Sequence, residues 1–584
     1  MDVPLHKIIK QAVIIASCEE PDFECFEIVS FYDRQYASWQ QSIAKFIAEY
    51  YTCSLGEALS LMSPFSLHVK AYEPFTCKEK IILSSQQQEA KNFLQNHSQS
   101  LLFGDTGSGK TEIYMSIMEE VLARGKSALL LMPEIGLTPQ MKKRLEKHFG
   151  DVVALWHSKL TKKKKEEILS SLAKGHIRII AGARSALFLP LPDIGLIVVD
   201  EEHDESYKAS NRPRYNARDM ALVFGQKLQV PVVLGSATPS LTSYTRLPTF
   251  RLKGTFYESS RDIVYEKAHN TLSPMVLDTI AHTMDIKKQA IVFLPTRAHF
   301  KYVTCKECGI SVECPYCSVG MSLHKQISAL KCHYCHYTQA IPKSCHSCGS
   351  EMMEANRMGT SEMVEQLREA FPLHVIEKFD RDEVTTETKL KSLLKRFNEK
   401  EIDILVGTQM LSKGHDYHDV ALSVIMGLDS QLMMPDFKAR EKALALCLQI
   451  AGRSGRKGVG RVLIQTMNPE FFDAYMGDFE KFLNDELPYR KGLYPPFTKM
   501  LRLLIAHKNE VKCQEVTHAC LEKLERLNNG IEIIGSGRAD IGRIAGKHRY
   551  HVLLRSVSAK ALLQAGLTCK APFVEIDMDP QVFS

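Results

Sequence analysis

Short apolar runs alternate with longer amphipathic segments along the chain from Leu101 onward. Five runs, each long enough for one strand, come first: Ser100–Phe103, Ala128–Met132, Ile177–Ala181, Ile194–Val199 and Val230–Leu234. Runs that are apolar throughout are typical of strands buried on both faces, and the segments between them have the period of helices. The pattern predicts an α/β domain in which helices cover both faces of a parallel sheet.

A second series of the same kind follows and predicts a second α/β domain. Its strand-like runs are Ala290–Leu294, Val375–Ile376, Ile402–Val406, Leu422–Met426 and Arg461–Gln465. A cysteine-rich segment separates the first run from the rest, so we expect it to be inserted into this second domain.

The two ends of the chain have weaker patterns. Near the beginning, Ala12–Ala16 is compatible with a strand and Ser38–Met62 has helical periodicity. After Pro488, the pattern predicts one helix and two strands, at Val511–Leu527, Leu501–Ala506 and His551–Leu554. We expect a short N-terminal domain and a C-terminal domain of the α+β class.

A glycine-rich loop joins the first predicted strand to a predicted helix, Glu112–Arg124. Residues 104–111 read GDTGSGKT, which has the spacing G-x-x-x-x-G-K-T. The glycines let backbone N–H groups wrap a phosphate, Lys110 reaches the β- and γ-phosphates, and the Thr111 hydroxyl is placed to bind Mg²⁺. Such a turn can arise by chance, but here the strand and helix lie where the motif requires them. The sequence therefore predicts an ATP site.

Charged residues suited to phosphoryl transfer follow other predicted strands. Ile194–Val199 leads into DEEH, in which Asp200 can hold Mg²⁺ and Glu201 can orient the attacking water. Residues 449–456, QIAGRSGR, place Arg453 and Arg456 three apart at what we expect to be a helix start, as cationic groups for the γ-phosphate. Acidic residues at a strand end usually form a solvated loop, and a basic helix is usually part of the protein surface. Here the phosphate loop, the acidic strand end and the arginines follow one another along the chain, and this combination favours a role in hydrolysis.

Half of the 16 cysteines form four C-x-x-C pairs in one segment. This density predicts two tetrahedral Cys₄ zinc sites, although the spacing alone leaves open which pairs share an ion. Histidines in the segment are possible substitutes, but eight thiolates already complete two sites. A redox role is disfavoured because no thioredoxin-like pattern surrounds the pairs. The expected zinc ligands are Cys305, Cys308, Cys314, Cys317, Cys332, Cys335, Cys345 and Cys348.

Composition excludes several other classes of protein. The remaining cysteines are scattered, unlike a secreted disulfide framework, and suit a reducing compartment. The first residues lack the design of a signal peptide, and no apolar run reaches the ~18 residues of a membrane span. The 74 basic and 68 acidic residues give a net charge of +6, too small to prove a nucleic-acid partner. We expect a cytoplasmic protein that does not contact a membrane.

Taken together, these motifs resemble those of superfamily 2 helicases. DEEH is similar to their second motif, SAT at residues 236–238 to the third, and QIAGRSGR to the sixth. LSSQQ at residues 83–87 resembles the glutamine motif that reads adenine. The resemblance implies two tandem RecA-like domains with ATP in their cleft. It also implies nucleotide contacts from Gln87, Gly104, Asp105, Thr106, Gly107, Ser108, Gly109, Lys110 and Thr111.

Longer strings narrow the resemblance. They are PEIGLTPQ at residues 133–140, GARSALF at 182–188, GTQMLSKGHD at 407–416 and YPPF at 494–497. With DEEHDESYK and the cysteine pairs, they resemble the primosomal protein N′ (PriA) family of bacterial replication-restart helicases, from about Leu83 to the C-terminus. The resemblance implies a DNA-dependent ATPase and 3′→5′ DNA helicase that uses ATP, Mg²⁺ and two Zn²⁺. Implied partners are forked and single-stranded DNA, single-stranded DNA-binding protein, other primosome proteins and, indirectly, the replicative helicase or its loader. The implied location is the bacterial cytoplasm, in association with the nucleoid.

The family also implies roles for individual residues. Its interleaved zinc pattern would place Cys305, Cys308, Cys345 and Cys348 on one ion and the other four cysteines on the second. The loop Asp204–Asp219 interleaves aromatic and basic groups that can stack bases and grip phosphates, where the family has a DNA-sensing loop, although a merely solvated loop is the plainer alternative. The expected DNA-contacting residues are Arg184, Tyr207, Lys208, Arg214, Tyr215 and Lys413. The basic segment Gly535–Tyr550 resembles the family's C-terminal DNA-binding segment, or is only a solvated strand edge.

The N-terminal region departs from the family pattern. Members usually begin with a 3′-end-binding domain followed by a winged helix. Here YYTCSLGE at residues 50–57 resembles the end of the first domain, and Pro64 is too close to Gln87 for a winged helix of ~60–70 residues. We therefore expect the winged helix to be absent and the 3′-end-binding domain to be truncated, which puts capture of a DNA 3′ end in doubt.

The expected organisation has six parts. Residues 1–80 form a truncated DNA-binding domain, 81–250 the first RecA-like lobe, 251–303 and 351–485 the second lobe, 304–350 its zinc module, and 486–584 a domain for DNA or partners. The expected function is recognition of stalled or recombined forks and the start of primosome assembly, so that replication restarts. Two alternatives stay open: a fork-binding scaffold whose motor is dispensable for helicase loading, and an RNA helicase, which would not explain the cysteines or YPPF.

Overall fold

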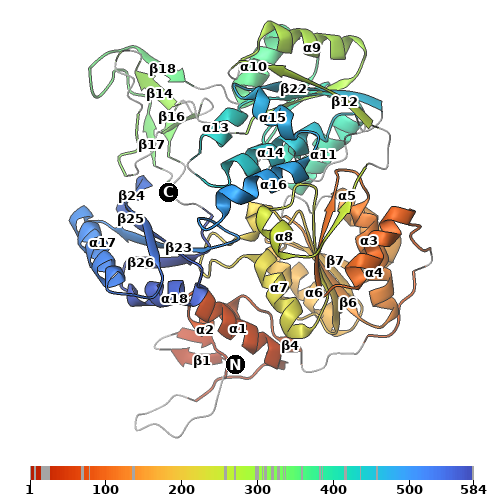
Figure 1. Cartoon of the computed structure of the whole chain (residues 1–584), viewed down its shortest axis with the longest axis vertical. Helices are drawn as coiled ribbons and strands as arrows, with labels where there is room; N and C mark the ends of the chain where they lie inside the picture. Colours follow the sequence, from red (N-terminus) through yellow and green to blue (C-terminus); the bar gives the residue numbers. More distant parts are fainter. Residues whose placement is uncertain are drawn as a thin grey trace.

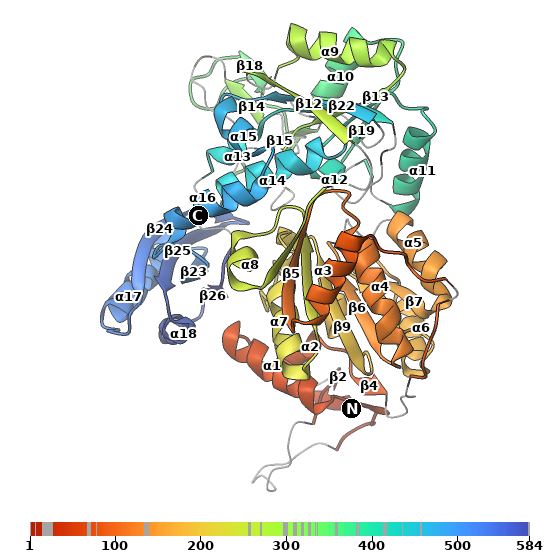
Figure 2. The same ribbon diagram turned by 45° about the vertical axis from the view of Figure 1, so that its right-hand side comes forward.

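Two parallel-sheet lobes form the body of the molecule, with three smaller parts around them (Figure 1). The computed structural model describes residues 2–5, 8–14, 27–66, 72–77, 79–133, 139–254, 259–268, 271–295, 302–305, 307, 312–316, 321–324, 329–332, 335, 337–356, 360–380, 383–384, 386–412, 417, 419–434, 436–455 and 458–581. Figure 2 shows the second lobe stacked above the first, with the C-terminal domain beside them. Among the described residues, no helix combines the length and the apolar character that crossing a bilayer requires.

Lobe 1 contains a seven-stranded parallel sheet in the order β11-β5-β10-β9-β6-β8-β7. All five strands predicted in this region are confirmed, with ends that differ by two residues at most. β7 and β11 were not predicted because each is only four residues long and β11 contains an arginine. The strands are β5 (Gln99–Gly104), β6 (Ser127–Leu131), β7 (Val153–Trp156), β8 (Ile179–Gly182), β9 (Ile194–Asp200), β10 (Val232–Ser236) and β11 (Thr249–Leu252). The helices are α3 (Ser85–Gln95), α4 (Lys110–Ala123), α5 (Pro139–Phe149), α6 (Lys162–Ala173), α7 (Ala217–Leu228) and α8 (Leu241–Arg246).

Lobe 2 repeats the design with six parallel strands in the order β12-β22-β21-β13-β20-β19. The edge strand β12 was not predicted because polar and charged residues interrupt its apolar positions. The strands are β12 (Ser259–Glu266), β13 (Gln289–Phe293), β19 (Ile376–Phe379), β20 (Ile404–Gly407), β21 (Val420–Ile425) and β22 (Gly458–Gln465). The helices are α9 (Pro274–Asp285), α10 (Thr360–Ala370), α11 (Glu387–Asn398), α12 (Gln409–Ser412), α13 (Leu428–Leu432), α14 (Ala439–Ala451), α15 (Pro469–Tyr475) and α16 (Phe479–Arg490). The predicted α/β class and tandem lobes are thus confirmed.

The cysteine-rich module is an antiparallel sheet inserted between β13 and α10, inside lobe 2. Its strands are β14 (Tyr302–Cys305), β15 (Ser322–His324), β16 (Ala329–Lys331), β17 (Thr338–Ala340) and β18 (Met353–Asn356), in the order β17-β16-β15-β14-β18. Val303, Met321 and Leu330 form a small core beneath the cysteines. Ile544 of the C-terminal domain packs against this core, and the Gly546 N–H donates a 2.8 Å hydrogen bond to the Tyr316 carbonyl.

The C-terminal domain is an antiparallel sheet, β24-β25-β23-β26, covered by two helices, as an α+β domain should be. The predicted helix and both predicted strands are present. The elements are β23 (Lys499–His507), α17 (Glu510–Glu525), β24 (Glu532–Ile544), β25 (Lys547–Ser556), α18 (Ala559–Thr568) and β26 (Val574–Met578).

The N-terminal region is a small unit docked on lobe 1. Its elements are β1 (Asp2–Leu5), β2 (Ile8–Gln11), β3 (Arg34–Gln35), α1 (Ser38–Tyr50), α2 (Leu55–Ser60) and β4 (Phe65–Ser66). The prediction of a strand at Ala12–Ala16 is wrong for residues 12–14, the part that the structure describes, because these residues lie outside any strand. The strand in this region lies earlier in the chain: β2 ends at Gln11 and pairs with β1. The predicted helix at 38–62 is divided in two because Ser54 caps a new helix by accepting from the Glu57 N–H. Between β4 and α3, residues 72–77 and 79–84 form neither helix nor strand.

Candidate active site and metal sites

The glycine-rich loop of lobe 1 has the backbone conformation that wraps a phosphate. Gly107 and Gly109 have φ angles of +84° and +83°, in the left-handed region that favours glycine. A Cβ at Gly109 would lie 2.2 Å from Gln87 Nε2. Gln87 is buried and donates a 3.2 Å hydrogen bond to the Ser108 carbonyl. Gln87, which we expect to contact adenine, therefore also supports the phosphate loop through this hydrogen bond.

Lys110 and Asp105 are held at the two ends of the same loop. Lys110 begins α4, and its Nζ donates to the Gly104 carbonyl at 2.8 Å. The Asp105 carboxylate accepts from Arg251 at 2.5 Å and from the Gly254 N–H at 2.8 Å. Arg251 lies on β11, which the sequence pattern did not reveal, so its role in fixing the loop was missed.

The acidic pair expected to serve hydrolysis lies where β9 ends, two strands away from the loop in the sheet. Tyr114 of α4 donates to Asp200 Oδ1 at 3.3 Å. Burial, and next the neighbouring Glu201 carboxylate, raise the pKa of Asp200 to about 6. Glu201 has a φ angle of +48°, an uncommon conformation for a residue other than glycine, and it turns the chain at the strand end.

The donor set at this site fits a magnesium nucleotide. Ser108 Oγ and Glu201 Oε2 are buried and have no hydrogen-bond partner among the described residues. Buried polar atoms of this kind are rare unless a ligand or water satisfies them. The orphaned oxygens lie on the phosphate loop and beside Asp200, which are the two places where a phosphate and its cation would sit.

His203 connects the acidic strand end to lobe 2. Its Nδ1 lies 2.8 Å from Ser236 Oγ of the SAT motif, and its Nε2 lies 2.7 Å from Gln449 Nε2 of α14. A Cβ at Gly452 would lie 3.2 Å from Thr106 Cγ2, so the end of α14 faces the phosphate loop. The sequence identified the motif containing His203 but not this bridge, because the partner residues come from distant segments.

The arginines of QIAGRSGR occupy a different position from the expected one. We expected a helix start, but α14 ends at Ala451, and Arg453 follows Gly452 after that end. The apolar positions before Gln449 belong to α14, and Gly452 is the C-cap residue of this helix. Arg453 is buried, whereas Arg456 lies outside the described residues.

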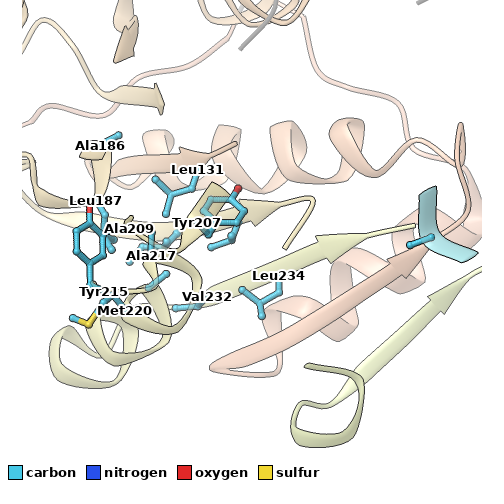
Figure 3. Packing of buried hydrophobic residues seen from close by; sticks show 14 of the residues in the cluster. Leu131, Ala186, Leu187, Tyr207, Ala209, Tyr215, Ala217, Met220, Val232 and Leu234 are labelled. Carbon is cyan, nitrogen blue, oxygen red and sulfur yellow. The ribbon is translucent and has the colours of Figure 1, made fainter. Parts of the chain in front are cut away.

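The loop after DEEH is packed into the protein. Tyr207 and Tyr215 are 1% and 4% exposed, and Figure 3 shows their rings among buried residues such as Met220. The Tyr207 hydroxyl donates to the Asp200 carbonyl at 2.6 Å. Neither ring therefore offers a free face for a base in this conformation, contrary to the expectation of a stacking loop. Both tyrosines belong to a buried hydrophobic cluster, in which the Tyr215 ring meets the Phe188 ring edge to face with their centroids 5.0 Å apart.

The basic residues of this loop are also paired within the protein. Lys208 Nζ lies 3.0 Å from Asp577 Oδ1, with both side chains 5% exposed. Arg214 Nε lies 2.9 Å from Glu575 Oε1, also on β26. Arg184 donates to two loop carbonyls, those of Ser206 and Lys208, at 3.0 Å each. Lys413, the remaining expected DNA contact, lies outside the described residues.

The described cysteines of the module gather into two clusters. One contains Cys305, Cys345 and Cys348, the other Cys314, Cys332 and Cys335, with the sulfurs of each within 4.8 Å of one another. The Sγ–Sγ distances are 3.5 Å for Cys305 and Cys348 and 3.6 Å for Cys314 and Cys335. Four thiolates around Zn²⁺ lie about 3.8 Å apart, so both clusters fit zinc. The grouping follows the interleaved pattern; its expected fourth members, Cys308 and Cys317, lie outside the described residues.

Comparison with known proteins agrees with this geometry. The DEAD/DEAH box helicase family matches residues 84–247, and the helicase conserved C-terminal domain matches residues 355–458. The PriA DNA helicase Cys-rich region matches residues 314–339, and the primosomal protein N C-terminal domain matches residues 490–581. Replication restart protein PriA of Helicobacter pylori (strain ATCC 700392 / 26695) is 42% identical in an alignment 598 positions long, which covers 99% of this chain and 95% of that protein. The chain belongs to the PriA family of replication restart proteins.

More distant PriA proteins match over most of the chain. The protein of Treponema pallidum is 33% identical over 95% of this chain and 89% of its own length, and that of Bacillus subtilis is 34% identical over 83% and 64%. Among solved structures, RecG bound to a three-way DNA junction aligns with 77% of this chain and 53% of its own chain, at 17% identity and a TM-score of 0.42. That structural likeness is too weak to add to the argument. The PriA relatives and the helicase domains identify this chain as a replication-restart DNA helicase.

Proposed function

We propose that the protein hydrolyses ATP to unwind DNA with 3′→5′ polarity, recognises stalled or recombined forks, and starts primosome assembly there. The observation that carries the proposal is the convergence of the phosphate loop, Asp200 and Glu201, and the end of α14 on one site between the lobes. Hydrolysis at such a site changes how the lobes contact each other, and this change can drive movement along a strand.

Each residue of the site has a proposed role. The loop amides and Lys110 bind the phosphates, and Thr111 and Asp200 hold Mg²⁺, which neutralises charge on the phosphates when it is bound. Glu201 orients the attacking water. Arg453 and Arg456 place positive charge near the γ-phosphate from lobe 2. Gln87 contacts adenine while it supports the loop.

The zinc module and the DNA contacts complete the proposal. Two Zn²⁺ ions, each held by four thiolates, would stiffen a module too small to have a large core. Residues 204–219 would contact DNA only after the loop leaves β26, because Lys208 and Arg214 are now paired with acidic residues there. Single-stranded DNA-binding protein and the loader of the replicative helicase are the proposed partners at the fork.

Replacement of Lys110 by alanine tests the motor. We expect the variant to lose at least 100-fold in DNA-stimulated ATPase rate, because the ammonium that binds the phosphates is removed, while fork binding stays within about twofold. Lys163→Ala, at an exposed position of α6, is the matched control. Unchanged hydrolysis in Lys110→Ala would refute the site assignment.

Polarity and fork recognition need separate measurements. Unwinding is measured on partial duplexes with a 3′ or a 5′ single-stranded tail, and ATPase rate on single-stranded, duplex and forked DNA at one stated salt concentration. The proposal predicts unwinding only from the 3′ tail and the highest rate on forks. Full helicase loading by Lys110→Ala protein would instead favour a scaffold, and stronger stimulation by structured RNA than by forks would favour an RNA helicase.

A further inference from the structure

A second set of metal-ligating side chains lies in lobe 1, away from both cysteine clusters. Cys77 comes from the segment before α3, Glu119 from α4 and His148 from the last turn of α5. One ligand atom from each of the three lies within 4.8 Å of the other two. His148 Nε2 is 2.6 Å from Glu119 Oε1, and these two side chains are only 15% and 14% exposed.

We propose that Cys77, Glu119 and His148 form a zinc site of their own. A thiolate, an imidazole and a carboxylate are the three ligand types that Zn²⁺ accepts, and three protein ligands leave a fourth position for water. Mg²⁺ and Ca²⁺ prefer sites made only of oxygen, so the thiol argues against them. Zinc binding at this point would displace the thiol proton to solvent.

The surroundings bring Glu119 and His148 together before any ion is bound. α5 runs beside α4, since Arg144 pairs with Glu112 near the start of α4 and His148 meets Glu119 further along it. The Ile81 N–H donates to Glu119 Oε1 at 3.2 Å, which orients the carboxylate before an ion is bound. Tetrahedral zinc with bonds of 2.0–2.1 Å separates nitrogen and oxygen by about 3.3 Å, so the 2.6 Å contact must open by roughly 0.7 Å.

A cysteine beside a histidine and a glutamate also suggests a nucleophile, but the environment of Cys77 opposes that interpretation. Burial, and then the Glu119 carboxylate, raise the pKa of the Cys77 thiol to about 11. Nucleophilic cysteines need a lowered pKa and a positive environment. A cation placed among the three groups reverses this situation, because it favours the thiolate.

The position of the site gives it a structural consequence. Glu119 is nine residues after Lys110 in the same helix, which corresponds to about 13 Å along its axis. Cys77 lies in the segment that leads from the N-terminal region into lobe 1. A bound ion would therefore join that segment to the helix that begins with the phosphate-binding lysine, and to α5.

Zinc content of the purified full-length chain tests the proposal. Zinc is measured by mass spectrometry after gel filtration, for the wild type and for Cys77→Ser, Glu119→Gln and His148→Gln. We expect each variant to contain one zinc ion per chain fewer than the wild type. Cys53→Ser is the matched control, because Cys53 is also half-buried but lies in neither the module nor this cluster, and it should keep the full content.

Two further readouts keep the test independent of folding. Zinc added to metal-stripped protein should raise the melting temperature of the Cys53→Ser protein more than that of Cys77→Ser. When cobalt replaces zinc, the protein should show a sulfur-to-metal absorption band. The intensity of this band should be lower in Cys77→Ser by the contribution of one cobalt–thiolate bond. A wild type that holds only the two ions of the cysteine module, or variants with unchanged zinc content, would overturn the proposal.

Discussion

A single methyl group at Gly109 would block the phosphate loop. The residue has a φ of +83°, and an added Cβ would meet Gln87 Nε2 at 2.2 Å. Two costs therefore combine at this position: the left-handed backbone conformation, about 1–2 kcal/mol for residues other than glycine, and displacement of Gln87 from the Ser108 carbonyl. The loop depends on glycine here for space as well as for conformation.

Gly109→Ala is expected to weaken ATP binding by more than tenfold, as measured by fluorescence titration with a labelled nucleotide. Gly150→Ala is the matched control: Gly150 has a φ of +68°, but a Cβ there meets nothing within 4 Å. Gly150→Ala should lower the melting temperature, because its backbone strain is similar to that of Gly109→Ala, and it should leave nucleotide affinity unchanged. Equal affinities for the two variants would show that Gln87 does not limit the loop.

Asp200 makes the affinity for magnesium nucleotide depend on pH. Its pKa, raised to about 6, means that the protein without metal binds a proton there at pH values below 6, whereas an ordinary aspartate is ionised above about 4. A cation must displace this proton, so its affinity falls as pH falls through 6, by about tenfold between pH 7 and pH 5. Isothermal titration of Mg²⁺-ADP at both pH values measures the effect. Binding of ADP without Mg²⁺ is the control and should fall less.

At the scale of elements, the loop 204–219 behaves as a contact between two domains. Lys208 and Arg214 of the loop form ion pairs with Asp577 and Glu575 of β26, and the Tyr207 hydroxyl donates a hydrogen bond to the Asp200 carbonyl. One short loop thus touches the acidic strand end on one side and the C-terminal sheet on the other. A displacement of β26 would reach Asp200 and Glu201, the proposed hydrolytic residues, through this loop.

Asp577→Asn is expected to loosen this contact. Lys208 and Arg502 both pair with Asp577 and are nearly buried, so removing the negative charge leaves two uncompensated cations, at a cost of about 3–5 kcal/mol. We expect a lower first melting transition and faster proteolysis between residues 204 and 219. Glu515→Gln, which breaks an exposed pair in the same domain, should cost about 1 kcal/mol or less. Similar melting curves for the two variants would contradict the argument.

At the scale of the whole molecule, polar contacts connect the two lobes within the described residues. Gln449 of α14 lies 2.7 Å from His203, Tyr244 donates to Glu480 at 3.0 Å, and Lys442 pairs with Glu205. Gln449 is the contact nearest the acidic pair, because His203 follows Glu201 by two residues. Under the proposed function, a change in the position of lobe 2 would reach the proposed hydrolytic site through this contact.

Gln449→Ala is expected to lower the DNA-stimulated ATPase rate about tenfold, which corresponds to a loss of 1.4 kcal/mol in transition-state stabilisation. Nucleotide affinity should change less than about twofold, since the side-chain hydrogen bonds of Gln449 go to His203 and Thr238. Gln431→Ala, also in lobe 2 but bonded only to Met434 in its own segment, is the control and should keep the full rate. A parallel loss of affinity and rate would mean that Gln449 acts on binding instead.

The sequence was sufficient where function is encoded locally. The phosphate loop, the acidic strand end and the cysteine pairs were found because each motif occupies one short segment, and most buried strands were found because they are apolar throughout. It failed where contacts join distant segments. Nothing near Lys208 reveals Asp577, so a loop rich in aromatic and basic residues suggested DNA rather than burial. The segment QIAGRSGR was expected at a helix start, but Arg453 follows the end of α14.

The hydrogen bond between Gly546 and Tyr316 closes a ring of parts around the molecule. Lobe 1 is joined to β26 through Lys208, the C-terminal hairpin to the cysteine module through this bond, and the module to lobe 2 through its own chain. In a closed ring of linked domains, a change in the angle between two neighbours requires a change at another contact in the ring. If the ATP cleft opens, another joint must rotate or break, and the joint at the hairpin tip is made by the Gly546 hydrogen bond and the packing of Ile544. In that case the hairpin between β24 and β25 would be alternately attached to the cysteine-rich module and released from it during the nucleotide cycle.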